Sequence, residues 1–84
     1  MAYQLSIKPR AIKALEKISE PHFSAIKAAI YNLADNPRPV GCKKLKGRDG
    51  WRIRVGDYRI IYNIFDQMLS VDVINLGHRK DIYE

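Results

Sequence analysis

The chain has 84 residues, 46% of them hydrophobic and 29% charged, with a formal net charge of +6. This length allows a modest core, so we expect a single domain over residues 1–84. No apolar run approaches the roughly 18 residues that span a bilayer, and no signal-peptide pattern opens the chain. Because the single cysteine, Cys42, cannot form an internal disulfide, these features together predict a cytoplasmic protein.

The first half of the chain predicts a strand followed by two helices. Apolar and polar residues alternate from Tyr3 to Ile7, as in a half-buried strand of about six residues. Apolar stripes at helical spacing follow Pro9 and Pro21, and the second stripe ends at the proline-rich segment that begins at Asn36. Neither short amphipathic helix is stable alone, so we expect a helical hairpin that covers a sheet.

A two-stranded hairpin is the strongest pattern in the chain. A loop from Val40 to Gly50 leads into residues 51–62, which read WRIRVGDYRIIY, with Gly56-Asp57 as a two-residue turn. If Val55 pairs with Tyr58 across this turn, alternation places one set of apolar and aromatic residues on a single face. This set contains Trp51, Ile53, Val55, Tyr58, Ile60 and Tyr62.

The other face of this hairpin carries three arginines. In the same register Arg54 lies opposite Arg59, and Arg52 lies opposite Ile61. Like charges opposite each other destabilise a sheet. A fold that accepts this cost is expected to hold an anion on this face.

A last strand follows Asp66-Gln67, where Leu69, Val71 and Val73 alternate with other residues. If Asp66-Gln67 is a second two-residue turn, these three apolar residues join the helix-covered face. The predicted order is β-α-α-β-β-β, an α+β protein of two layers in which a helical hairpin packs on one face of an antiparallel sheet. Periodicity leaves open whether the first strand pairs at an edge of the sheet or inserts within it.

The positive charge is concentrated between residues 38 and 59. This segment holds eight basic and two acidic side chains, which accounts for the whole net charge of +6. Such a field suits a polyanion such as nucleic acid, or an acidic protein partner, although charged loops are also common as solvated surface. We predict nucleic-acid contacts for the basic residues before the hairpin, which are Arg38, Lys43, Lys44, Lys46 and Arg48.

The arginines of the hairpin and a short C-terminal tail together suit phosphodiester chemistry on RNA. Two distant histidines and one cysteine match no zinc spacing, so we expect neither a metal nor a cofactor. Attack by a ribose 2′-hydroxyl builds negative charge that guanidinium groups stabilise, although arginine is a poor base. The tail adds Arg79, Tyr83 and His78, the last a residue type that exchanges protons near neutral pH. The alternative is an arginine face that only binds phosphates or an acidic peptide.

The hairpin sequence, the preceding Leu45-Lys46-Gly47 and the tail GHRKDIY (residues 77–83) together resemble the RelE/ParE toxin superfamily, over almost the whole chain. Within it the chain is similar to the RelE branch. That branch contains toxins of toxin–antitoxin pairs that enter the ribosomal A site and cut messenger RNA. The resemblance implies the fold described above and a cognate antitoxin as partner, and the ribosome then joins RNA as a target for the early basic residues that the charge pattern singles out.

The resemblance also assigns roles to the arginines of the hairpin. Arg52 and Arg54 match basic residues that contact the scissile region, and Arg59 matches the arginine that stabilises the transition-state phosphate. RelE has lysines at the first two positions, where a lysine is the favoured general base. Arginine fills that role poorly, so the base stays open.

Three tail residues also match the family. Arg79 matches a residue implicated in leaving-group protonation or charge stabilisation, and Tyr83 matches one that orients or stacks on the substrate. His78 resembles a histidine that some relatives use in acid/base work. Either His78 or Tyr83 therefore serves as base, or the RNA is activated mainly by alignment and electrostatics.

Two other functions remain as alternatives. The ParE branch shares the fold but inhibits DNA gyrase without cleaving RNA. A non-catalytic nucleic-acid-binding module would explain the charge but not the tail.

Overall fold

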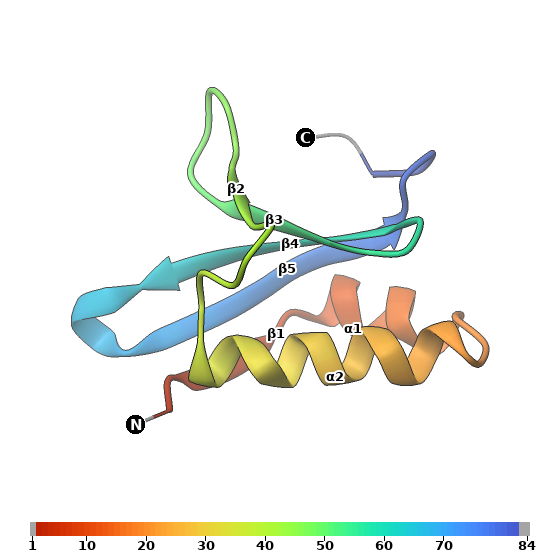
Figure 1. Ribbon diagram of the computed structural model, residues 1–84, viewed down its shortest axis with the longest axis horizontal. Helices are drawn as coiled ribbons and strands as arrows, with labels where there is room; N and C mark the ends of the chain where they lie inside the picture. Colours follow the sequence, from red (N-terminus) through yellow and green to blue (C-terminus); the bar gives the residue numbers. More distant parts are fainter. Residues whose placement is uncertain (1, 83–84) are drawn as a thin grey trace.

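Two helices cover one face of a five-stranded sheet in the computed structural model, which describes residues 2–82 (Figure 1). In chain order the elements are β1 (Gln4–Ile7), α1 (Pro9–Glu16), α2 (His22–Asp35), β2 (Lys43–Lys44), β3 (Trp51–Val55), β4 (Tyr58–Phe65), the short 3-10 helix η1 (Asp66–Met68) and β5 (Ser70–His78). The predicted two-layer α+β fold is confirmed. No helix within residues 2–82 is long and apolar enough to cross a membrane.

The sheet differs from the prediction in two respects. Its order is β1-β5-β4-β3-β2, with β1 at one edge and parallel to β5, so the sheet is mixed rather than antiparallel. The short strand β2 extends the other edge by pairing Lys43 with Arg52 and Lys44 with Trp51. Neither feature has a local signal, because β1 and β5 are distant in sequence and two residues are too few for a periodic pattern.

The core lies between the helices and the sheet. Pro9 occupies the first turn of α1, where its missing N–H is harmless, and α2 buries Ile26, Ile30 and Leu33 at steps of three and four. The apolar face of the sheet packs against these helices, as the hairpin pattern predicts. The buried residues of this core are Ala11, Ile26, Ile30, Leu33, Ile53, Ile60, Tyr62, Val71, Val73 and Leu76.

The hairpin between β3 and β4 has the predicted register. Val55 pairs with Tyr58, and Arg54 pairs with Arg59. Gly56 has a φ of 59°, as expected for the first central residue of a tight hairpin turn. The hairpin is local, so its turn chemistry and strand alternation were sufficient to predict it.

The connection between β4 and β5 is longer than predicted. Phe65 pairs with Ser70, so residues 66–69 form the turn and the predicted two-residue Asp66-Gln67 turn is wrong. Leu69 caps η1 with a φ of 49° and is 45% exposed, so it does not join the helix-covered face. A turn longer by two residues leaves the alternation intact, and Val71 and Val73 are buried as predicted.

A β-bulge lies in the middle of β5. Ile61 pairs with Asn75 but Tyr62 pairs with Val73, so Ile74 is an extra residue in the ladder. One extra residue reverses the faces of everything that follows it in the strand. Consequently Leu76 is buried against the helices, whereas strict alternation from Val73 would put it on the opposite face.

Candidate nucleic-acid interface

The sheet face opposite the helices carries the hairpin arginines. Arg54 is exposed and Arg59 is half-buried, and the two are direct cross-strand partners. Arg52 lies between Lys43 on one side and Ile61 on the other and is only 4% exposed. The structure thus brings all three arginines to one face, at different depths.

The tail brings a fourth arginine to the hairpin turn. The backbone N–H of Arg79 donates to the carbonyl of Asp57 at 2.7 Å, and Arg79 Nε lies 3.8 Å from Asp57 Oδ1. Arg54, Arg59 and Arg79 together line a pocket of about 120 Å³, with Gly56, Asp57 and Tyr58 completing its wall. A small pocket lined by three arginines matches the needs of a phosphate and of the extra charge in its transition state.

A second hollow lies next to this pocket, because Arg54 lines both. It has a volume of about 410 Å³ and is lined by Lys43, Lys44, Lys46, Arg52 and Arg54. We call it the basic groove. A groove lined by five cationic side chains suits a nucleic-acid backbone, whose successive phosphates repel one another until they are neutralised. Three of the five basic residues predicted before the hairpin therefore lie at this site.

His78 lies on the opposite face of the sheet. It pairs with Tyr58, and the two rings are 5.7 Å apart, while Tyr58 also contacts His22 of α2 at 5.3 Å. The Nδ1 atom of His78 accepts a hydrogen bond from the Lys80 backbone at 3.2 Å. The structure therefore does not bring His78 to the arginines, and the bulge in β5 is the reason.

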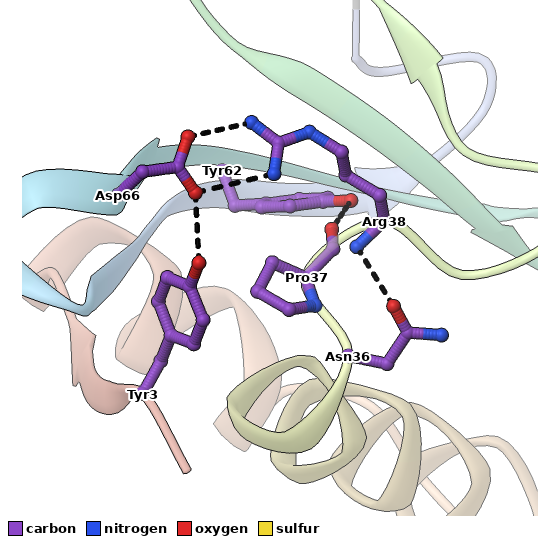
Figure 2. Close-up of polar contacts among 6 residues, drawn as sticks. All are labelled: Tyr3, Asn36, Pro37, Arg38, Tyr62 and Asp66. Carbon is purple, nitrogen blue, oxygen red and sulfur yellow. Dashed lines mark hydrogen bonds and ion pairs between the residues drawn. The ribbon is translucent and has the colours of Figure 1, made fainter. Parts of the chain in front are cut away.

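Arg38 belongs to a polar network at the far end of β4 (Figure 2). Its two terminal nitrogens donate to the Asp66 carboxylate at 3.2 and 2.8 Å, and Tyr3 Oη donates to the same carboxylate at 2.8 Å. These donors, Arg38 first, lower the pKa of Asp66 from its ordinary 3.8 to about 2. Arg38 also lies 5.0 Å from the ring centre of Trp51. It joins three segments of the fold and does not line the basic groove.

Two other predicted residues lie apart from both hollows. Arg48 is exposed in the loop between β2 and β3 and lines neither of them, and Tyr83 lies outside the described residues. The sequence analysis missed Asp57, which holds the Arg79 backbone, and Ile82, which packs on the arginine face. In the sequence, Ile82 could have been recognised as an apolar residue among the charged residues of the tail.

The fold and this site define a small basic α+β protein with an arginine-lined open sheet face. Residues 5–83 match the family described as "ParE toxin of type II toxin-antitoxin system, parDE". The chain belongs to the RelE/ParE superfamily of toxins, which confirms the resemblance read from its motifs.

Individual relatives carry the RelE name. The chain is 30% identical over 83 residues to "mRNA interferase toxin RelE" of Escherichia coli (strain K12), covering 95% of this chain and 86% of that protein. The archaeal RelE-RelB complex from Pyrococcus horikoshii contains a chain with a TM-score of 0.84 and 27% identity, covering 98% of this chain and all of that one. The intact E. coli RelBE complex gives a TM-score of 0.78 and 29% identity, with 92% and 96% covered.

Proposed function

We propose that this protein is the toxin of a toxin–antitoxin pair and an endoribonuclease that cleaves messenger RNA in the ribosomal A site. The observation that carries the proposal is the convergence of Arg54, Arg59 and Arg79 on one small pocket that adjoins the basic groove. A relative 30% identical over nearly the whole chain is named an mRNA interferase, which supports the RelE function over gyrase inhibition.

Cleavage proceeds by attack of a ribose 2′-oxygen on the adjacent phosphorus. The 2′-O–P bond forms, the P–O5′ bond breaks, the 2′-hydroxyl loses its proton and the departing 5′-oxygen gains one. The products are a 2′,3′-cyclic phosphate and a 5′-hydroxyl. Arg54, Arg59 and Arg79 stabilise the charge that accumulates on the phosphate oxygens, so the reaction needs no metal ion.

The basic groove holds the RNA on one side of the scissile phosphate. Its lysines act as point charges on flanking phosphates, and Arg52, anchored within the sheet, fixes the floor. Binding through several phosphates releases counterions, so affinity for RNA falls steeply with salt. Arg48 reaches RNA or the ribosome from its exposed loop, and Arg38 supports this end of the sheet through Asp66.

Activation of the 2′-hydroxyl rests mainly on alignment and electrostatics. Arginine is protonated at any ordinary pH, and the His78 ring packs against Tyr58 on the other side of the sheet. The roles predicted for His78 as a proton carrier and for Tyr83 as a substrate-orienting residue are tested by His78→Gln and Tyr83→Phe. A loss of cleavage in His78→Gln beyond its loss of stability would restore the histidine to the mechanism.

The proposed partner is an antitoxin whose acidic segment covers the arginine face. Several structural neighbours are RelE-RelB complexes, and the basic field of this face complements an acidic chain that folds on binding. Because translation takes place in the cytoplasm, we propose that the protein acts there.

Primer extension on messenger RNA after brief induction tests this function. We expect cuts within translated codons for the wild type and for Arg10→Ala, which removes an exposed charge from α1. Arg59→Ala and Arg79→Ala should abolish the cuts and relieve growth arrest while the circular dichroism spectrum stays unchanged. Intact messages with gyrase-dependent DNA damage would instead support the ParE function, and full toxicity of both arginine variants would refute the site.

A further inference from the structure

A small apolar cluster lies on the arginine face, separate from the main core. It consists of Leu45, Ile61 and Ile82, which are 5%, 2% and 7% exposed. Ile61 lies in the middle of β4, whereas Leu45 follows β2 and Ile82 follows β5. Figure 1 shows the loop after β2 and the tail on the side of the sheet opposite the helices.

Gly77 leaves the space in which the side chain of Ile82 packs, and we call this position the seat of Ile82. A Cβ atom at residue 77 would lie 2.9 Å from Ile82 Cγ1 and 3.1 Å from Ile82 Cδ1. The first distance is shorter than side chains tolerate, so an alanine at residue 77 would force Ile82 to move. Gly77 pairs with Arg59, and the carbonyl of Ile82 accepts a hydrogen bond from Arg59 Nη1 at 3.4 Å. The seat is therefore built beside the proposed reaction site.

This apolar cluster connects the segment that borders the basic groove with the tail that carries Arg79. Leu45 directly precedes Lys46 of the basic groove, and Ile82 follows three residues after Arg79, which lines the arginine pocket. The segment from Arg79 to Ile82 is short, and its backbone is hydrogen-bonded to the end of β5. The amides of Ile82 and Asp81 both donate to the carbonyl of His78, at 3.2 and 2.8 Å. A displacement of Ile82 is therefore transmitted to Arg79.

The direct contacts of the Arg79 side chain are too weak to hold it alone. Its pairing with Asp57 spans 3.8 Å, and the two side chains are 61% and 64% exposed. Exposed ion pairs of this kind contribute little, whereas burial of an isoleucine side chain is one of the stronger stabilising contributions available to a short tail. The buried Ile82 is therefore the apolar anchor of the tail, beside the hydrogen bond from the Arg79 backbone to the Asp57 carbonyl.

We propose that Ile82 is a positioning residue for RNA cleavage and that Gly77 leaves the space in which it packs: together they help to hold Arg79 at the hairpin turn beside Arg54 and Arg59. This inference rests on the proposed function. Ile82 does not contact the scissile phosphate in this scheme. It acts through the guanidinium of Arg79, so its loss lowers the rate of the chemical step rather than the affinity for the ribosome.

A pair of variants tests this on translating ribosomes. Ile82→Ala and Gly77→Ala should each lower kcat roughly 10- to 100-fold, the range expected when a catalytic group is displaced by about 1 Å, with KM nearly unchanged. Ile82→Val, which keeps most of the side chain, should retain activity. The double variant should be no worse than Ile82→Ala alone, because alanine at residue 82 lacks the two atoms that a Cβ at residue 77 would meet. Additive losses in the double variant would overturn the seat.

Amide hydrogen exchange gives a readout that does not depend on activity. The amides of Arg79 and residue 82 should exchange faster in Ile82→Ala, while those of the β4–β5 ladder keep their protection. Equal loss of protection in that ladder would mean a purely structural effect and would refute the positioning role, as would wild-type kcat in Ile82→Ala. If the wild type itself does not cleave, the proposed function fails, and unchanged exchange at these amides would separately refute the anchor.

Discussion

Substitution of Arg54 by glutamine should make the protein more stable and less active. The register pairs Arg54 directly with Arg59, and Arg79 adds a third guanidinium to the same pocket. Two unit charges about 6 Å apart in water repel each other by roughly 0.7 kcal/mol. Glutamine keeps much of the side chain's length without its charge. We expect Arg54→Gln to raise the free energy of unfolding by about 0.5–1 kcal/mol at low salt, within the range for like-charged cross-strand pairs.

Urea unfolding at two salt concentrations measures this effect. With a urea m-value of about 1 kcal/mol/M for a chain of this size, the midpoint should rise by about 0.5–1 M in 10 mM salt. The gain should shrink in 1 M salt, where the Debye length falls from about 30 Å to about 3 Å. Arg10→Gln is the matched control, because it removes the same charge from an exposed position on α1.

Cleavage by the same Arg54→Gln protein completes the test. Loss of a guanidinium from the phosphate pocket should lower the rate at least about tenfold, since stabilisation of transition-state charge is commonly the largest catalytic contribution. Two results would refute the reasoning: a stability gain no larger than that of Arg10→Gln, or full cleavage activity. Either would mean that the opposed arginines are a solvated pair and not a phosphate site.

Two further predictions concern the end of the sheet drawn in Figure 2. The fully buried Tyr62 donates its hydroxyl to the Pro37 carbonyl at 2.7 Å, so Tyr62→Phe should cost about 1–2 kcal/mol in urea unfolding; an unchanged midpoint would argue against that hydrogen bond. Asp66 has a pKa lowered from 3.8 to about 2, so its contribution to stability is complete above pH 4 and is lost as the pH falls towards 2. Asp66→Asn should therefore lower the free energy of unfolding near neutrality and make it depend less on pH between pH 4 and 2. If the free energy of the variant fell in parallel with that of the wild type over this range, the assignment would be contradicted.

Local patterns were sufficient for the hairpin and the helices. The turn at Gly56 and the alternation on both sides of it specify a register without help from the rest of the chain, and the register was predicted correctly. The same reasoning failed at Leu69, because a four-residue turn and a two-residue turn leave identical alternation in the strand that follows. Only the pairing with β4 distinguishes them.

No local sequence pattern indicates where in the fold each site residue lies. Arg38 is close in sequence to the lysines of the basic groove, yet its partner is Asp66, 28 positions away. The seat of Ile82 on Gly77 likewise depends on the tail folding back over its own strand. Contacts of this kind are fixed by packing, which periodicity does not encode.

The sequence by itself determined that a helix-covered sheet would present opposed arginines on its other face, because side-chain alternation and turn chemistry act over a few residues. The tertiary structure decided which tail residues accompany those arginines. One extra residue in β5, Ile74, turns His78 towards the helices and Gly77 towards the arginines. That bulge is favoured because it lets β5 bury Leu76 in the core, a packing requirement that exists only once the helices and the sheet have met.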